Sequence, residues 1–117
     1  MEGLYNIHTK KEGCELSIGY SARITGKRLK IAGEETETGL YLASCTDDGT
    51  YDTDSSTWTA IGMENIVDNT NTKILFNIPS TVTSGSYRLI LRTAYGSGTR
   101  INKTVRTGVY AEKITVA

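Results

Sequence analysis

The sequence lacks any long hydrophobic run, and this argues against a segment that spans a membrane. No stretch of the 117 residues approaches the roughly eighteen consecutive apolar residues that predict a membrane-spanning helix. The first residues, Met1-Glu2-Gly3, lack the basic and then apolar start of a secretory signal peptide. We therefore expect a soluble, cytoplasmic protein that makes no contact with a membrane.

Cysteine, histidine and proline are also scarce, with two, one and one in the chain. Two cysteines are too few for a disulfide scaffold, so we expect Cys14 and Cys45 to be reduced thiols, although a pair between them stays open. A single histidine, His8, excludes a multi-histidine metal site and leaves no base placed against a nucleophile. We predict that the protein is not an enzyme and uses no cofactor, metal or small-molecule substrate.

Threonine is what the sequence has in excess, with eighteen residues beside nine serines and seven tyrosines. Threonine and tyrosine suit a pleated, half-buried strand and form helices poorly. Residues that favour helices are few. The length fits one domain over residues 1–117, and the composition favours an all-β fold.

Short strand signals recur along the chain, separated by turn residues. Apolar and polar residues alternate with a period of two, or form short apolar runs, in segments near residues 4–9, 14–20, 28–32, 39–44, 58–61, 73–78, 87–92, 101–105 and 109–116. Turn signals include Thr25-Gly26, Asp48-Gly49, Asp68-Asn69 and Gly96-Ser97-Gly98. This pattern predicts two packed antiparallel sheets with seven to nine strands in total.

The stretch from Pro79 to Tyr87 indicates a specific architecture. Pro79 ends a strand because it cannot donate to a sheet ladder, and Gly85 supports a sharp corner. Tyr87 then enters the next strand, where its hydroxyl can reach back to the backbone of the corner. Leu89 stands where antibody domains have a cysteine. The sequence therefore predicts an immunoglobulin-like β-sandwich of the wider, non-antibody group.

Several pieces in fixed order resemble a known family over residues 24–117. The chain is similar to a bacterial family of unknown function with an Ig-like fold, which typically lies C-terminal to a histone-like, HU-related DNA-binding domain. The matching pieces are Gly26 to Gly33, Thr38 to Leu42, Ile66 to Asn69, the strand ending at Pro79, Gly85 to Leu89, Val105 to Thr107, and Glu112 to Val116.

The resemblance implies an accessory or interaction module that positions or couples its neighbour. The HU-related half is not among these residues, so we expect a fragment or a stand-alone relative. The resemblance thus implies that a domain next to this one associates with DNA, rather than this domain itself. It supplies no catalytic or ligand-binding residues.

Charge is segregated along the chain although the net charge is zero. Residues 34–68 hold nine acids and no base, whereas residues 69–117 hold seven bases and one acid. If two C-terminal strands pair around Gly96-Ser97-Gly98, four arginines share one outer face with an exposed Ile90. These partner- or phosphate-binding candidates are Arg88, Arg92, Arg100 and Arg106, which Lys27, Arg28 and Lys30 extend if their strand lies nearby. We expect a protein partner first and nucleic acid second, unless these bases only pair with the acidic segment or serve solubility.

Three further sequence features bear on other possible functions. The stretch from Thr46 to Thr57 reads as one long solvated loop, and its carboxylates lack the spacing of an EF-hand calcium site: Asp47, Asp48, Asp52 and Asp54. Exposed aromatics at Tyr51, Trp58 and Tyr95 would suit an extracellular adhesion or sugar-binding module. An exposed edge strand would suit a structural module that self-assembles.

Overall fold

The computed structural model describes residues 1–33, 38–95 and 101–117, with the backbone alone for residues 101–104. Its strands form two sheets, which confirms the predicted all-β sandwich. The elements in chain order are β1 (Gly3–Asn6), β2 (Lys11–Glu12), β3 (Glu15–Leu16), β4 (Ser21–Thr25), β5 (Gly39–Ser44), η1 (Ser55–Thr57), β6 (Thr59–Ile61), η2 (Met63–Asn65), β7 (Ile66–Asn69), β8 (Lys73–Asn77), β9 (Gly85–Tyr95), β10 (Ile101–Val109) and β11 (Ile114–Val116).

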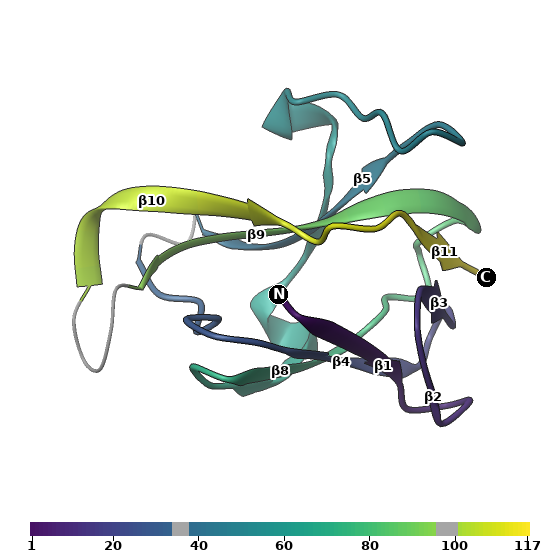
Figure 1. Ribbon diagram of the computed structural model, residues 1–117, viewed down its shortest axis with the longest axis horizontal. Helices are drawn as coiled ribbons and strands as arrows, with labels where there is room; N and C mark the ends of the chain where they lie inside the picture. Colours follow the sequence, from purple (N-terminus) through teal and green to yellow (C-terminus); the bar gives the residue numbers. More distant parts are fainter. Residues whose placement is uncertain (34–37, 96–100) are drawn as a thin grey trace.

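The two sheets lie face to face (Figure 1). The first has the order β2-β1-β4-β8-β7, and the second has the order β3-β11-β9-β5-β6 with β10 also paired to β9. The chain passes from the second sheet to the first through η2, between β6 and β7. All pairings are antiparallel within the described residues except that between β3 and β11, which is parallel.

The core forms where the apolar positions of both sheets meet. Leu40 and Leu42 of β5 and Leu89 and Leu91 of β9 are at most 1% exposed, and they face the first sheet. Phe76 of β8 is fully buried on the facing side. Burying each such side chain contributes roughly 1.5–3 kcal/mol, so the period-two pattern fixes which face of each strand turns inward.

The predicted tyrosine corner is present. The Tyr87 hydroxyl donates to the backbone carbonyl of Thr83 at 2.7 Å, between β8 and β9. Pro79 lies just beyond the end of β8, and its carbonyl accepts from the N–H of Val82. Gly85 begins β9, and Leu89 is completely buried. The corner therefore fixes the entry of the strand that carries both Arg88 and Arg92.

Strand boundaries differ from the prediction in several places. The expected strand over 14–20 is reduced to β3, and β4, which had not been predicted, supplies the central strand. Asp68 and Asn69, expected to be a turn, belong to β7. The described residues form eleven strands rather than seven to nine, because several are only two to four residues long.

The expected strand over 28–32 is also absent, because side chains bond several of its backbone groups and a single backbone bond, from the Ala94 N–H to the Ala32 carbonyl at 2.8 Å, joins it to β9 in the described residues. The Asn69 side chain accepts from the Ile31 N–H and donates to the Ile31 carbonyl. The Thr93 hydroxyl donates to the Lys30 carbonyl at 2.7 Å and accepts from the Ala32 N–H. This segment thus links β7 of one sheet to β9 of the other, with Leu29 and Ile31 buried between them.

Candidate functional site

The predicted four-arginine face does not form, because the strand register divides it. Arg92 lies opposite Thr107 and Ile90 opposite Val109, so these residues share the outer face of the second sheet with Arg88. Arg106 lies opposite Thr93, on the other face. A register shift between Ile101 and Arg106 breaks the alternation on which the prediction depended. Arg100 lies outside the described residues.

The outer face around Arg88 and Ile90 is covered, contrary to the expectation of an exposed apolar spot. Ile90 is 0% exposed. The segment that follows β5 stands on this side of the sheet, away from the other sheet (Figure 1). Arg88 attaches that segment: its Nη1 donates to the Gly49 carbonyl at 2.9 Å, and its Nη2 donates to the Tyr110 carbonyl at 3.0 Å. Its guanidinium carbon also lies 5.5 Å from the centre of the Tyr51 ring.

Arg92 lies on the same face, one outward position beyond Ile90, and is half-buried. It makes none of the bonds that Arg88 makes, and its Nε is buried without a hydrogen-bond partner among the described residues. Tyr51 and Trp58 line a cavity with it. The aromatic residues that suggested an exposed platform are therefore packed against this sheet, and Tyr95 is only 4% exposed.

A second basic region does form, on the opposite side of the second sheet. The Arg106 guanidinium donates to the Arg28 carbonyl, and its Nε donates to the Tyr95 carbonyl at 3.4 Å. Arg106 therefore joins Lys27, Arg28 and Lys30, which are exposed. We call these four residues the basic cluster. None of its members pairs with a carboxylate in the described part of the chain, where the ion pair found is Lys73–Asp68 at 3.1 Å.

The acidic segment after β5 is held together by its own carboxylates. A hydrogen bond from the Thr46 hydroxyl and one from the Thr50 N–H lower the pKa of Asp48 to about 2. The Asp54 side chain caps η1, and the N–H of Ser56 lowers the pKa of Asp54. Asp52 accepts from the Asp54 N–H at 2.9 Å. Within residues 1–33, 38–95 and 105–117, no three acidic, cysteine or histidine side chains come close enough to hold a metal ion.

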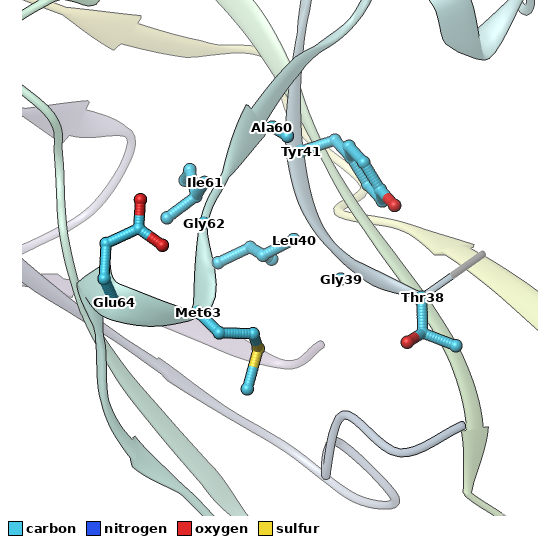
Figure 2. Close-up of a pocket in the computed structure, with 9 residues that line it drawn as sticks. All are labelled: Thr38, Gly39, Leu40, Tyr41, Ala60, Ile61, Gly62, Met63 and Glu64. Atoms are coloured by element: carbon cyan, nitrogen blue, oxygen red, sulfur yellow. The ribbon is translucent and has the colours of Figure 1, made fainter. Parts of the chain in front are cut away.

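A cavity of about 340 Å³ opens where β6 diverges from β5. Figure 2 shows its lining residues, with the Glu64 carboxylate and the Tyr41 hydroxyl on opposite sides. Met63 of η2 is 47% exposed at its rim. Glu64 is the one carboxylate among the lining residues, and no histidine, cysteine or lysine accompanies it. The lining residues of this cavity therefore do not provide an acid–base pair.

The remaining reactive groups are dispersed. His8 lies in an exposed turn and stacks on Tyr20 with ring centroids 3.7 Å apart. Cys14 and Cys45 are both free thiols. Burial and the adjacent Glu112 carboxylate, which accepts from the thiol at 2.9 Å, raise the pKa of Cys14 to about 11. A thiol with this pKa is a poor nucleophile at neutral pH.

Sequence reasoning missed two features of these surfaces. The packing of Tyr51 and Trp58 over the outer face gave no periodic signal, because both lie in an irregular segment. The junction of Arg106 with residues 27–30 depends on Thr93, whose hydroxyl anchors that segment across 63 positions of sequence. A local sequence pattern cannot predict a contact between residues so far apart in the sequence.

No helix in the described residues is long and apolar enough to span a membrane.

Comparison with known proteins adds a family and a structural neighbour. A family model described as a domain of unknown function (DUF4469) with Ig-like fold matches residues 1–108, so the match begins before the region 24–117 that carried the resemblance. A search of curated proteins finds no match. A crystal structure of a protein described as a "putative bacterial DNA binding protein", from Bacteroides vulgatus, is similar with a TM-score of 0.83 and 24% identity. The alignment covers 100% of this chain and 46% of that protein, so this chain spans less than half of its length.

Proposed function

Because the chain belongs to the family of domains of unknown function with an Ig-like fold, we propose that it is a non-catalytic interaction module that binds a polyanion, duplex DNA in the first instance, through its basic cluster. The observation that carries this proposal is the contact of the Arg106 side chain with the backbone of the exposed segment 27–30. Four positive charges from two distant parts of the chain meet there without carboxylate partners among the described residues. Phosphate groups are the natural partners of such a cluster.

The rigid attachment of the basic cluster to both sheets supports this role. The segment 27–33 is fixed by hydrogen bonds to both sheets, so the cluster is presented on a rigid support. Gly33 adopts a φ of 118°, and a Cβ there would lie 2.9 Å from the Ala94 side chain, so the segment approaches β9 as closely as only glycine allows. A rigidly held charged surface loses little conformational entropy on binding.

The description of the structural neighbour also supports the proposal. The Bacteroides vulgatus protein is by its description a candidate DNA binding protein, and a domain of this fold makes up part of it. The resemblance to domains that follow HU-related domains points the same way. In such an arrangement the module would add phosphate contacts beside a neighbouring DNA-binding part, and would carry no sequence readout of its own.

The proposal is tested by fluorescence anisotropy of a labelled DNA duplex titrated with the protein at low and near-physiological salt. Contacts with about four phosphates predict a slope of about −3.6 in a plot of log affinity against log salt concentration. A variant with Lys27, Arg28 and Lys30 changed to glutamate should lose this binding. Absence of binding by the unaltered protein at low salt would refute the proposal.

A second candidate function is self-association through the edge of the first sheet. Strand β7 lies at that edge and, among the described residues, pairs with β8 alone, and its Val67 is 61% exposed. Met63, just before it, is also exposed. An uncovered edge with apolar side chains can pair with a second copy. A solution mass of twice the monomer by light scattering, returned to the monomer by Val67→Lys, would establish this function, and a monomer at high concentration would exclude it.

A further inference from the structure

The outer face of the second sheet carries a site that is independent of the basic cluster. We propose that Arg92, Tyr51 and Trp58 bind a carboxylate carried on a six-membered ring, either an aromatic acid or a uronic acid sugar. This inference goes beyond the proposed function and stands whether or not the basic cluster binds DNA.

The site is a cavity of about 320 Å³ between β9, β10 and the segment that follows β5. Its lining residues are Tyr51, Thr53, Ser55, Trp58, Arg92 and Thr107. This volume is at the lower end of the range of about 300–1,000 Å³ for small-ligand pockets, so it suits one ring with its substituent rather than an extended chain. Across the strand, Arg92 is flanked by Thr107 on one side and by Gly39, which has no side chain, on the other.

Arg92 supplies an unmet requirement for an acceptor. No protein acceptor bonds its guanidinium within the described residues, and its Nε is buried. Arg88, two outward positions earlier on the same strand, also has a buried Nε without a partner, but two backbone carbonyls hold its Nη groups, so the contrast with Arg92 lies in the Nη groups. Buried N–H groups in native proteins nearly always have a partner. Because Nε has almost no accessible surface, the ligand would meet the two Nη groups, and a carboxylate bound end-on by both would make two parallel charged hydrogen bonds.

The two aromatic rings provide the surface for the body of the ligand. Their centroids are 6.5 Å apart and their planes are inclined by 55°, so they form a wedge rather than a closed stack. The Trp58 indole N–H donates to the Asp52 carbonyl at 2.7 Å, and Arg88 lies over the Tyr51 ring, so both rings are held in place. The two rings contact each other, so a ligand ring would pack against the sides of this pair that line the cavity. The hydroxyls of Thr53, Ser55 and Thr107 can bond polar substituents.

The surrounding charge favours a single carboxylate over a phosphate. Asp52 and Asp54 are exposed and alternate in the sequence with the lining residues Thr53 and Ser55. The lowered pKa of Asp54 keeps that carboxylate ionised at neutral pH. The two negative charges of a phosphate would both be repelled by these carboxylates, whereas Arg92 can compensate only one negative charge.

Trp58 makes the site directly observable, because it is the one tryptophan in the chain. Titrations of the full chain with benzoate and with glucuronate should change its fluorescence saturably in at least one case, and which of the two binds distinguishes an aromatic acid from a sugar acid. Benzamide is the matched neutral control for benzoate. No saturable change with either acid, or equal affinity for benzamide and benzoate, would overturn the proposal.

Variants locate the binding group. Arg92→Met keeps the apolar stem and removes all donors, so it should weaken binding about ten- to a hundredfold. Lys27→Met, which lies in the basic cluster, should leave the affinity unchanged, and near-UV circular dichroism confirms that both variants keep the native fold. Unchanged affinity in Arg92→Met would overturn the assignment of Arg92. Tighter binding of phenyl phosphate than of benzoate would overturn the carboxylate class.

Discussion

The two basic regions of this domain contain the same residue types in opposite surroundings. On the outer face of the second sheet, Arg88 and Arg92 are half-buried beneath the segment that follows β5, next to Tyr51 and Trp58. In the basic cluster, Lys27, Arg28 and Lys30 extend into solvent and Arg106 bonds to backbone beside them.

The difference teaches that surroundings, rather than charge alone, decide what an arginine can do. A guanidinium removed from water must bond to something nearby, and this makes it a structural group or a selective binding group. An exposed cation contributes little to stability and remains available to a large anionic partner. Substitutions that treat the two regions alike should therefore give different results.

The largest effect is expected where the outer face was predicted to be exposed and is not. Ile90→Ala should lower the free energy of unfolding by about 2–5 kcal/mol, because it leaves a cavity under the covering segment. Val67→Ala, at an exposed position of β7, should change it by less than about 0.5 kcal/mol. Urea denaturation followed by Trp58 fluorescence measures both. Similar values for the two variants would show that the outer face is open to solvent.

Arg88 should be the structural member of the two outer arginines. Arg88→Met leaves the carbonyls of Gly49 and Tyr110 without a donor and should cost about 1–3 kcal/mol of stability. Lys27→Met, in the basic cluster, should change stability by less than about 0.5 kcal/mol. Thermal unfolding of the two variants in parallel makes the comparison, and an Arg88→Met variant as stable as the unaltered protein would contradict it.

The tyrosine corner tests the core side of the same strand. Tyr87→Phe removes the hydrogen bond to the Thr83 carbonyl and should cost about 1 kcal/mol. Because the corner lies at the opposite end of β9 from Thr93, which anchors the basic cluster, DNA binding by the folded variant should be unchanged. A loss of stability under about 0.3 kcal/mol would show that the hydroxyl bond makes no net contribution.

Arg92 should give the smallest change in stability. Its donors have no protein partner among the described residues, so Arg92→Met should alter the free energy of unfolding by less than about 0.5 kcal/mol. Chemical denaturation of Arg92→Met and Arg88→Met in parallel compares their free energies of unfolding directly. A loss of 2 kcal/mol or more in Arg92→Met would make Arg92 a structural residue like Arg88, in contrast to its assignment as a binding group.

The sequence was sufficient to predict the fold class and the tyrosine corner, because both depend on local signals. The alternation of Tyr87, Leu89 and Leu91 and the sequence from Pro79 to Gly85 specify the start of β9 without reference to distant residues. The run of residues 39–44 was predicted as a strand with the bounds that β5 has.

The arrangement of the basic residues could not be predicted in the same way. A register shift in β10 moved Arg106 to the other face, and such a shift leaves no mark in the alternation of its neighbours. The segment 28–32 has the alternation of a strand, but Asn69 and Thr93 satisfy its backbone instead. The placement of this segment depends on side chains more than thirty positions away in the sequence.

The central claim, that the exposed basic cluster binds DNA and the outer arginine face does not, is tested most directly by NMR mapping of a DNA titration. Backbone amide signals of the ¹⁵N-labelled protein would be followed as duplex DNA is added at low salt, together with the indole N–H signal of Trp58. We predict shifts at residues 27–30, at Thr93 to Tyr95 and at Arg106, with Tyr51, Trp58 and Arg92 unchanged. Shifts at Trp58 and Arg92 with the basic cluster unchanged would contradict the account.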